Sequence, residues 1–249
     1  MELKQNERLD EVNDKLSLIQ DTEGLYFGTD ALLLAGYVNG SCKRAVEFGG
    51  GTGIISMLLL SRGKVDAIDC IEVQPSFAEL IDRNAILNGL CDRLNVVNCD
   101  VRDYHGRGEC DMVFTNPPYM KNNSGKECEN EKKHIARHEV FGDISEFCAC
   151  AAKNLRFGGI FYVVYRPDRL CDLLTSMRNS GIEPKRATFV HSNSNTPPSM
   201  VLVEGKRGGK SSMKITCPLI IYSSSDCKSY SDDMEYILAK GSFPAKFKK

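Results

Sequence analysis

From about residue 44 onward, short apolar runs rich in β-branched residues alternate with stretches whose apolar residues recur at helical spacing. This alternation is typical of a mostly parallel sheet with helices on both faces. The runs predict strands over 44–48, 66–72, 94–98, 111–116 and 159–165, and the intervening stretches predict helices over 53–61, 75–88, 144–155 and 167–180. Two further extended runs, 186–191 and 200–204, have no helix between them, which predicts an antiparallel hairpin at the edge of the sheet.

The length of 249 residues suits a single α/β domain, because domains usually span about 100 to 200 residues. We expect an N-terminal helical cap over 1–43, a core over 44–222 and a C-terminal tail over 223–249. Within the cap, Thr29 or Asp30 is the expected N-cap of a helix over 31–38. The polar stretches 121–133 and 192–199 are typical of loops.

Composition excludes several classes of protein. A net charge of -1 argues against a protein that coats nucleic acid through a global field, although a local basic patch remains compatible. The longest apolar runs, such as 54–60 and 160–165, are far shorter than the roughly 20 residues of a membrane span. The polar N-terminus lacks the apolar core of a secretory signal, so we expect a cytoplasmic protein.

The 11 cysteines are scattered and odd in number, which favours small buried hydrophobic side chains in a reducing compartment over a disulfide framework. The closest pair, Cys148 and Cys150, falls on a predicted helix, where side chains at this spacing point apart. We therefore expect no metal site.

A glycine-rich loop, Glu47-Phe48-Gly49-Gly50-Gly51-Thr52-Gly53, follows the first core strand and opens a helix. Glycines at 49, 51 and 53 allow a tight turn and close approach of a ligand. The next strand ends at Glu72, beside Val73, where a carboxylate can accept hydrogen bonds from both hydroxyls of a ribose. Asp100 and Val101 end the third strand, beside the adenine of the same ligand. Three strand ends around one crevice predict a nucleoside site rather than ordinary turns.

The spacing of the glycines indicates which kind of nucleoside-containing ligand the loop binds. A dinucleotide would fit the same architecture, but the Gly-x-Gly-x-x-Gly spacing of its binding loop is absent. Glu47 would attract the methionine ammonium group of S-adenosylmethionine and repel a pyrophosphate. S-adenosylmethionine is therefore the expected cofactor. At this point the sequence resembles the class I methyltransferases, whose Asp/Glu-x-Gly-x-Gly-x-Gly motif the loop matches.

Asn116-Pro117-Pro118-Tyr119 comes directly after the fourth core strand. Two prolines fix φ and lack backbone donors, so the carbonyl groups there can accept hydrogen bonds from a ligand. If Asn116 and the Pro117 carbonyl accept the two N–H bonds of a planar amino group, its lone pair can point at the methyl group for an in-line displacement. Tyr119 would stack on the base, which implies extrusion of a paired base. An ordinary turn is the alternative for these residues, and their place after a hydrophobic strand argues against it.

The motif occurs in methyltransferases of adenine in DNA and RNA and of a glutamine amide in release factors. Three flanking segments here resemble the bacterial tRNA1(Val) (adenine-N6) methyltransferase family, which modifies an anticodon-loop adenosine; they cover 27–34, 135–139, and 204–209 with 218–222. The resemblance implies a Rossmann-like class I methyltransferase fold with a seven-stranded, mostly parallel sheet and an antiparallel C-terminal edge hairpin. Gly50 departs from the family, which usually has a small side chain there, and this change should be tolerated.

The same resemblance implies roles for residues outside the two motifs. Phe27 and Thr29 should lie over the methionine end of the cofactor, although Phe27 could equally brace the helix that follows it. Arg137 and His138 could contact phosphate or the substrate loop, and His138 is as readily a structural histidine. Further candidate phosphate contacts are basic residues that could also be simply solvated: Lys121, Lys126, Lys132 and Lys133 after the motif, and Lys206, Arg207, Lys210 and Lys214 near the C-terminus. Acidic residues between the lysines of the first group reduce its net positive charge, which favours Lys206 and Arg207 as the phosphate contacts.

Two other functions stay open. A release-factor glutamine methyltransferase usually carries a separate helical domain before the glycine motif, whereas the motif here opens at Glu47, which disfavours that reading. A nucleoside-binding or RNA-binding module without catalysis would not need the intact set Glu47, Glu72, Asp100 and Asn116. The expected partner is tRNA, with no membrane, no metal and no obligate protein partner.

Overall fold

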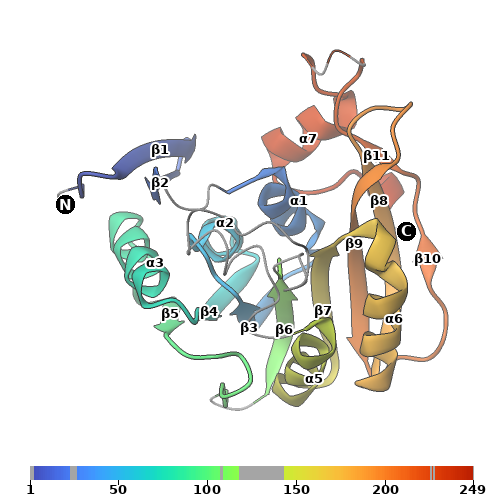
Figure 1. Ribbon diagram of the computed structural model, residues 1–249, viewed down its shortest axis with the longest axis horizontal. Helices are drawn as coiled ribbons and strands as arrows, with labels where there is room; N and C mark the ends of the chain where they lie inside the picture. Colours follow the sequence, from blue (N-terminus) through green and yellow to red (C-terminus); the bar gives the residue numbers. More distant parts are fainter. Residues whose placement is uncertain are drawn as a thin grey trace, which may run out of the picture.

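The computed structural model describes residues 3–22, 27–106, 109–117, 143–224, 226 and 228–248. Its centre is one sheet in which the parallel strands lie in the order β7, β6, β3, β4, β5 (Figure 1). These strands are β3 (Cys42–Phe48), β4 (Val65–Ile71), β5 (Leu94–Val97), β6 (Cys110–Thr115) and β7 (Leu155–Tyr165). All five expected core strands are confirmed, and β7 begins earlier than its apolar run indicated.

The predicted hairpin consists of β8 (Ile182–His191) and β9 (Pro198–Arg207), which pair antiparallel. β9 also pairs antiparallel with β7, so it lies between β7 and β8. Two short strands, β10 (Lys214–Ile215) and β11 (Leu219–Ile220), pair parallel with β8. The hairpin therefore continues the sheet as expected, but β10 and β11 cover its outer edge and raise the number of strands from the predicted seven to nine.

Helices cover both faces of the sheet, as Figure 1 shows. One face packs against α1 (Thr29–Tyr37), α2 (Ile54–Ser61), α3 (Pro75–Leu87) and α7 (Asp232–Lys240). The other face packs against α5 (Ile144–Asn154) and α6 (Leu170–Asn179), the latter preceded by a turn of 3-10 helix at Pro167–Arg169. Successive residues of β7 divide between the two cores, since Val163 belongs to one and Val164 to the other. This alternation is why the central strands read as continuous apolar runs.

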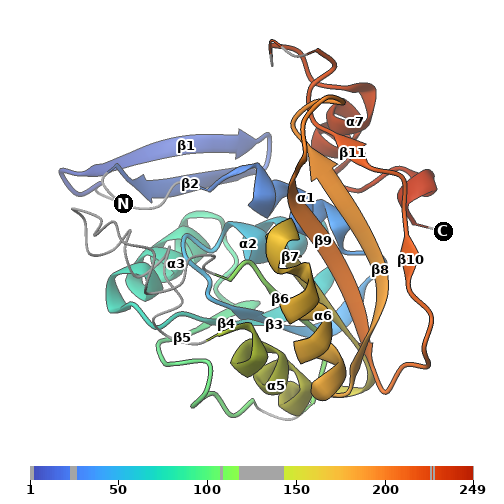
Figure 2. The same ribbon diagram turned by 45° about the vertical axis from the view of Figure 1, so that its right-hand side comes forward.

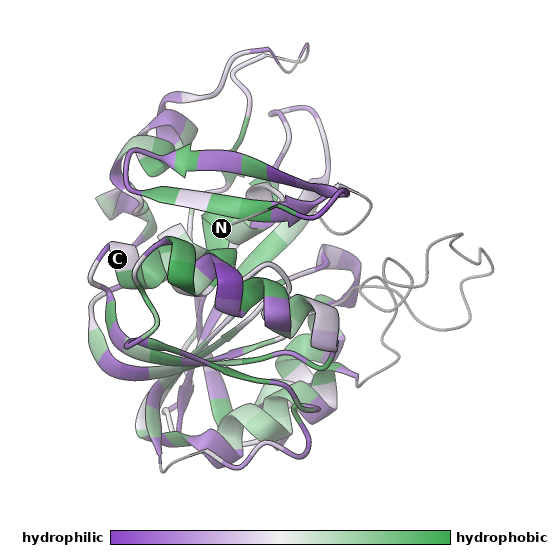
Figure 3. Cartoon of the chain, turned by 90° about the vertical axis from the view of Figure 1, so that its left-hand side faces the viewer, coloured by the Kyte–Doolittle hydropathy of each residue, from purple (hydrophilic) through white to green (hydrophobic). Residues whose placement is uncertain are grey.

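The expected N-terminal helical cap is wrong over its first part. β1 (Glu7–Asn13) and β2 (Leu16–Asp21) form an antiparallel hairpin that lies apart from the central sheet (Figure 2). In Figure 3 the more hydrophobic strand of this hairpin faces α3. That strand is β2, which is buried at nearly every position, whereas β1 is mostly exposed or half-buried. Pairing with β2 therefore gives the charged segment β1 a structure that its own sequence does not indicate.

The expected N-cap of α1 is also wrong. Gly28 is the N-cap residue, and Thr29 and Asp30 already belong to the helix. An extended glycine precedes the first turn, and no side chain caps it. At the other end of the chain, the tail over 223–249 contains α7 and a short 3-10 helix, Ala245–Phe247, whose apolar side chains join the core.

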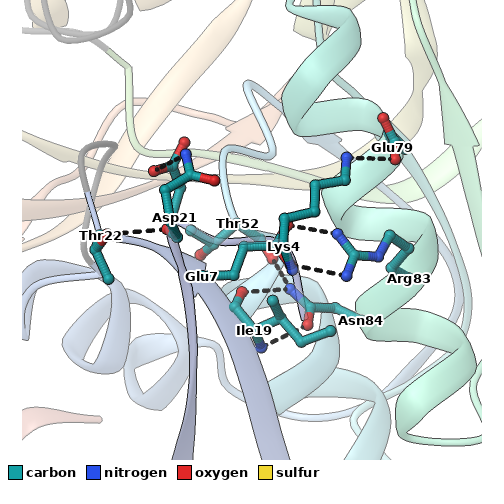
Figure 4. Close-up of polar contacts among 10 residues, drawn as sticks. Lys4, Glu7, Ile19, Asp21, Thr22, Thr52, Glu79, Arg83 and Asn84 are labelled. Atoms are coloured by element: carbon teal, nitrogen blue, oxygen red, sulfur yellow. Dashed lines mark hydrogen bonds and ion pairs between the residues drawn. The ribbon is translucent and has the colours of Figure 1, made fainter. Parts of the chain in front are cut away.

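The hairpin is fastened to α3 by polar side chains, drawn in Figure 4. Arg83 on α3 donates two hydrogen bonds to the carboxylate of Glu7, at 2.5 and 2.8 Å. Lys4 pairs with Glu79 one turn earlier on the helix, at 2.6 Å. Asn84 bonds the backbone of Ile19 and the carbonyl of Thr52 in the glycine loop. The hairpin, α3 and the loop are thereby joined into one unit.

None of the described helices is long and apolar enough to cross a membrane. The cysteines that lie in apolar stretches, Cys70, Cys110, Cys148 and Cys150, are buried as free thiols. Burial raises the pKa of Cys148 to about 12. Cys91, Cys171 and Cys217 are exposed, so the expectation of small buried hydrophobic side chains does not extend to them.

Candidate active site

The candidate site lies where the order of the strands reverses. The chain runs from β3 through β4 to β5 on one side, then returns to the other side of β3 as β6. Open α/β sheets bind ligands beyond the carboxyl ends of their strands at such a reversal. Phe48 and Thr115, which end β3 and β6, are paired, and the Thr115 hydroxyl donates to the Phe48 carbonyl at 2.8 Å. The glycine loop and Asn116 therefore begin side by side.

The glycine loop turns over the end of β4. The N–H groups of Gly49 and Gly50 donate to the carbonyl of Ile71 at 2.9 and 3.1 Å. Gly49 and Gly51 have φ angles of 73° and 57°, in the left-handed region that side chains disfavour. A Cβ atom added at either position would meet no atom of the described residues within 4 Å. The loop thus presents bare backbone to an open space that a ligand can enter.

Glu72 lies against this loop at the end of β4 and is 4% exposed. Its carboxylate accepts hydrogen bonds from the N–H groups of Gly51 and Gln74, both at 2.9 Å. Burial raises the pKa of Glu72, and these backbone donors oppose that rise. Each carboxylate oxygen has a second lone pair, so an oriented Glu72 can still accept from the two hydroxyls of a ribose. That binding role stays a prediction.

Glu47 is fully enclosed beneath the glycine loop. One carboxylate oxygen, Oε2, contacts the Ser56 hydroxyl and the Cys70 thiol. The other, Oε1, has no hydrogen-bond partner among the residues that the structure describes. Burial raises the pKa of Glu47 to about 8. A buried acceptor without a partner suits a ligand that brings a donor, such as the ammonium group of S-adenosylmethionine, better than it suits a phosphate.

Asp100 lies beyond β5, where Arg102 folds back onto it. The guanidinium donates to both carboxylate oxygens, at 2.9 and 2.6 Å, and the Arg102 backbone N–H donates at 2.8 Å. The hydrogen bonds from Arg102 lower the pKa of Asp100. Val101 is buried, and Val73 is half-buried next to Glu72. Asp100 is thus held as an oriented acceptor, although contact of Asp100 or either valine with adenine stays a prediction.

Asn116 is half-buried beyond β6, and Pro117 beside it is buried. The side-chain Nδ2 of Asn116 donates to Oδ2 of Asp30 at 2.8 Å. This contact links the end of β6 to the first turn of α1. Pro118 and Tyr119 lie outside the described residues, so their stacking and substrate roles stay predictions.

Phe27 and Thr29 are half-buried just before and at the start of α1. Phe27 packs against the core formed by α1, α2 and the sheet, which agrees with the bracing role, and its backbone N–H donates to Gln20 at 3.2 Å. A contact of Phe27 or Thr29 with a cofactor stays a prediction.

Lys206 and Arg207 are not brought to this site. Lys206 on β9 pairs with Ile160 on β7, and Ile160 pairs with Met112 on β6. Met112 precedes Asn116 by four residues, so Lys206 lies about 13 Å from Asn116 along the strand direction, at roughly 3.3 Å per residue. Arg207 lies further away, pairs with Glu109 at 3.9 Å and donates to the Leu155 carbonyl. These residues could touch tRNA only away from the reacting base. Arg137, His138 and the lysines over 121–133 lie outside the described residues.

Several residues of the site escaped prediction. Ser56 lies among apolar residues in the first half of helix α2 and is completely buried, so its position was an available signal. Asp30 was interpreted as a helix cap, and Arg102 carried no local signal. In the part of the chain that the structure describes, no group of three or more His, Cys, Asp or Glu side chains could hold a metal ion.

The sheet order, the glycine loop and the acidic residues beyond neighbouring strands define the fold of the class I methyltransferases. The chain belongs to the methyltransferase small domain family, whose model matches residues 22–177. The methyltransferase membership expected from the sequence is confirmed.

Relatives of known name agree with this family. A tRNA1(Val) (adenine(37)-N6)-methyltransferase of Phocaeicola vulgatus is 25% identical over 193 residues, which cover 77% of this chain and 81% of the relative. A protein of the same name from Escherichia coli O157:H7 is 27% identical over 181 residues, covering 71% of this chain and 73% of the relative.

Solved structures share the fold at lower identity. A protein from Agrobacterium tumefaciens, described as a predicted O-methyltransferase, is 18% identical with a TM-score of 0.69, covering 86% of this chain and 98% of that one. TYW2 of M. jannaschii, in complex with AdoMet, is 14% identical with a TM-score of 0.58, covering 83% and 88%. The expected class I fold is confirmed by these likenesses.

Proposed function

We propose that this chain transfers a methyl group from S-adenosylmethionine to the exocyclic N6 of an adenosine in tRNA. The observation that carries the proposal is the pairing of the ends of β3 and β6, which sets Asn116 beside the glycine loop. The names of the relatives at 25 and 27% identity support adenine in tRNA as the target. A valine tRNA and its anticodon loop rest on those names and on the resemblance of the flanking segments. A cytoplasmic location would follow from a tRNA substrate.

The residues around the loop suit this cofactor. Oriented acceptors at Glu72 and Asp100 match a ribose and an adenine amino group. Oε1 of Glu47, which has no partner in the described part of the chain, matches an ammonium group. Gly49 and Gly51 leave the space that the ligand would fill. S-adenosylmethionine supplies a methyl carbon on a cationic sulfur, and when the target nitrogen bonds to that carbon, the carbon–sulfur bond breaks and sulfur keeps its electron pair.

This chain would contribute mainly orientation. The lone pair of an aromatic amino group is delocalised into the ring, so the nitrogen is a weak nucleophile. Hydrogen bonds from its two N–H groups to Oδ1 of Asn116 and the carbonyl of Pro117 would favour a pyramidal nitrogen with its lone pair directed at the methyl carbon. The nitrogen becomes positively charged as the new bond forms and then loses one proton to water.

The tRNA would extend beyond this pocket. Tyr119 is proposed to stack on the extruded base, Pro118 to contact the substrate, and Arg137 to contact phosphate near it. Lys206 and Arg207, at the opposite end of the strands from Asn116, would contact the tRNA backbone at a distance from the reacting base. Neutralising both should then raise KM, weaken its salt dependence and leave kcat unchanged.

Incubation with labelled S-adenosylmethionine and total tRNA from a strain that lacks the enzyme tests the function. Mass spectrometry of the digested nucleosides should find new N6-methyladenosine in one valine tRNA. Asn116→Ala should lower transfer by at least roughly 100-fold while cofactor affinity stays within a few-fold. Label on protein alone would favour glutamine methylation, and wild-type turnover by Asn116→Ala would refute the role of Asn116.

A further inference from the structure

The contact between Asn116 and Asp30 fixes the direction of the Asn116 side chain. Nδ2 of Asn116 donates to Oδ2 of Asp30 at 2.8 Å, between residues 86 positions apart. A carboxylate only accepts hydrogen bonds, so the amide atom that faces it is the nitrogen and not the oxygen. Because the amide group is planar, its Oδ1 atom then lies on the opposite branch from the Nδ2 atom that faces Asp30.

Asp30 is itself held in place. Its other oxygen, Oδ1, accepts a hydrogen bond from the backbone N–H of Ala31 at 2.9 Å, in the first turn of α1. The carboxylate also folds back over Gly28, where an added Cβ atom would lie 2.5 Å from Oδ1. The positive end of the helix dipole favours an anion there. Glycine at position 28 thus makes room for the orientation of Asp30 that reaches Asn116.

The backbone before this turn is anchored as well. Gln20 at the end of β2 is 2% exposed, and its side-chain oxygen accepts from the N–H of Phe27 at 3.2 Å. A hydrogen bond from the hairpin thus holds the backbone at Phe27, directly before Gly28 and the first turn of α1.

We propose that Asp30 is a positioning residue for methyl transfer, which holds Nδ2 of Asn116 so that Oδ1 is offered to the target amino group. The inference rests on the proposed function. A flipped Asn116 would present N–H donors to an amino group whose own N–H groups are donors, and the pair could not bond. Accepting from Nδ2 also polarises the amide and strengthens Oδ1 as an acceptor.

The structural alternative is that Asp30 only stabilises the first turn of α1. Asp30→Ala separates the two roles when it is compared with Asp232→Ala, which removes an exposed first-turn acid from α7, away from the site. Positioning predicts that Asp30→Ala lowers kcat by roughly 10- to 100-fold, with KM for tRNA and the cofactor Kd changed by less than about threefold. Asp232→Ala should keep the wild-type kcat.

Asp30→Asn serves as the conservative variant and as a safeguard against misfolding of the alanine variant. Its side-chain oxygen can still accept from Nδ2 of Asn116, so kcat should lie between those of the wild type and Asp30→Ala. A fall in kcat that is matched by an equal loss of cofactor affinity or of folded protein in both Asp30 variants would overturn the proposal.

A measurement without substrate tests the contact directly. In a ¹H–¹⁵N spectrum, the Asn116 side-chain amide is assigned by its absence from Asn116→Ala. Asp30→Ala and Asp30→Asn should shift this signal and speed exchange of its protons, whereas Asp232→Ala should leave both unchanged. An unchanged signal in both Asp30 variants would refute the inference. Failure of the wild type to methylate tRNA would instead refute the proposed function, since the spectrum does not depend on tRNA.

Discussion

Asn84 on α3 bonds both backbone groups of Ile19 on β2: the Ile19 N–H donates to Oδ1 at 2.7 Å, and Nδ2 donates to the Ile19 carbonyl at 3.1 Å. One helical turn later, Asn88 makes the same pair of bonds with Ser17, at 3.1 and 2.8 Å. Alternate residues of a strand lie about 6.6 Å apart, close to the 5.4 Å pitch of a helix. The two asparagines therefore bond the edge of β2 much as a neighbouring strand would.

Asn84→Ala should destabilise the protein by about 2–4 kcal/mol. The substitution leaves the Ile19 N–H, the Ile19 carbonyl and the Thr52 carbonyl without this partner in a site that is 0% exposed. Asn88→Ala, at a half-buried site, should cost about 1 kcal/mol. Urea unfolding of both variants checks the difference. Because Thr52 belongs to the glycine loop, only Asn84→Ala should weaken cofactor binding, and equal affinities would contradict that link.

Gly50→Ala should destabilise the protein by about 1–3 kcal/mol for a purely steric reason. Its Cβ atom would lie 2.3 Å from the Cys70 sulfur and 2.8 Å from Cδ1 of Ile81, and Gly50 is not among the glycines with positive φ. The Cys70 thiol and the Ile81 side chain thus occupy the space that a side chain at position 50 would need. Cys70→Ala should therefore relieve part of the penalty.

A double-mutant cycle measures that relief by denaturant unfolding. The coupling between Gly50→Ala and Cys70→Ala should be favourable by about 1 kcal/mol. Gly51→Ala is the matched control, because its φ of 57° makes alanine cost roughly 1–2 kcal/mol through the backbone, with no described atom within 4 Å. Cys70→Ala should not change that cost. Strict additivity of Gly50→Ala and Cys70→Ala would refute the explanation.

The core of the fold could be predicted because its signals are local. The strands that end at Phe48, Ile71 and Thr115 are apolar runs followed by glycine or polar residues, and their ends form one crevice once the sheet is parallel. The hairpin β1–β2 could not be predicted in the same way. Its first strand is largely charged, and its second is completed by asparagine side chains of a helix far along the chain.

The residues of the site also differ in whether the sequence predicts them. Glu47, Glu72 and Asp100 could be placed at strand ends from the sequence, but their bonding partners could not. Ser56 and Asp30 come from helices that only the folded chain brings to Glu47 and Asn116. A local pattern identifies which group can do chemistry, whereas its orientation and pKa depend on burial and contacts that form only in the folded chain.

Arg102→Ala should weaken cofactor binding several-fold, and less than Asp100→Ala does. Removing the guanidinium leaves the Asp100 carboxylate held by one backbone N–H, so the rotamer that would meet the adenine amino group is less populated. The double variant should bind no more weakly than Asp100→Ala alone, because Arg102 acts through Asp100. Isothermal titration with S-adenosylmethionine measures each Kd. Tighter binding by Arg102→Ala would mean instead that the guanidinium competes with adenine.

Glu47 should make the ligand-free protein less stable as the pH rises. Burial raises its pKa in the folded protein to about 8, above the ordinary value of 4.5, so the folded state binds more protons than the unfolded state between these values. Its contribution to stability is fully present below pH 4.5 and is lost progressively as the pH rises toward 8. Glu47→Gln replaces the acid with a neutral group of the same shape and removes this dependence.

Urea unfolding of the wild type and Glu47→Gln from pH 5 to pH 9 measures the effect as a difference, in which groups common to both proteins cancel. The two stabilities should lie close together at pH 5, and Glu47→Gln should be the more stable by on the order of a few kcal/mol at pH 9. The sign follows from the cost of an ionised carboxylate whose Oε1 has no partner among the described residues. A difference that does not change with pH would mean that Glu47 is ionised in the folded protein as it is in the unfolded protein. The buried carboxylate would then need a cation as its partner.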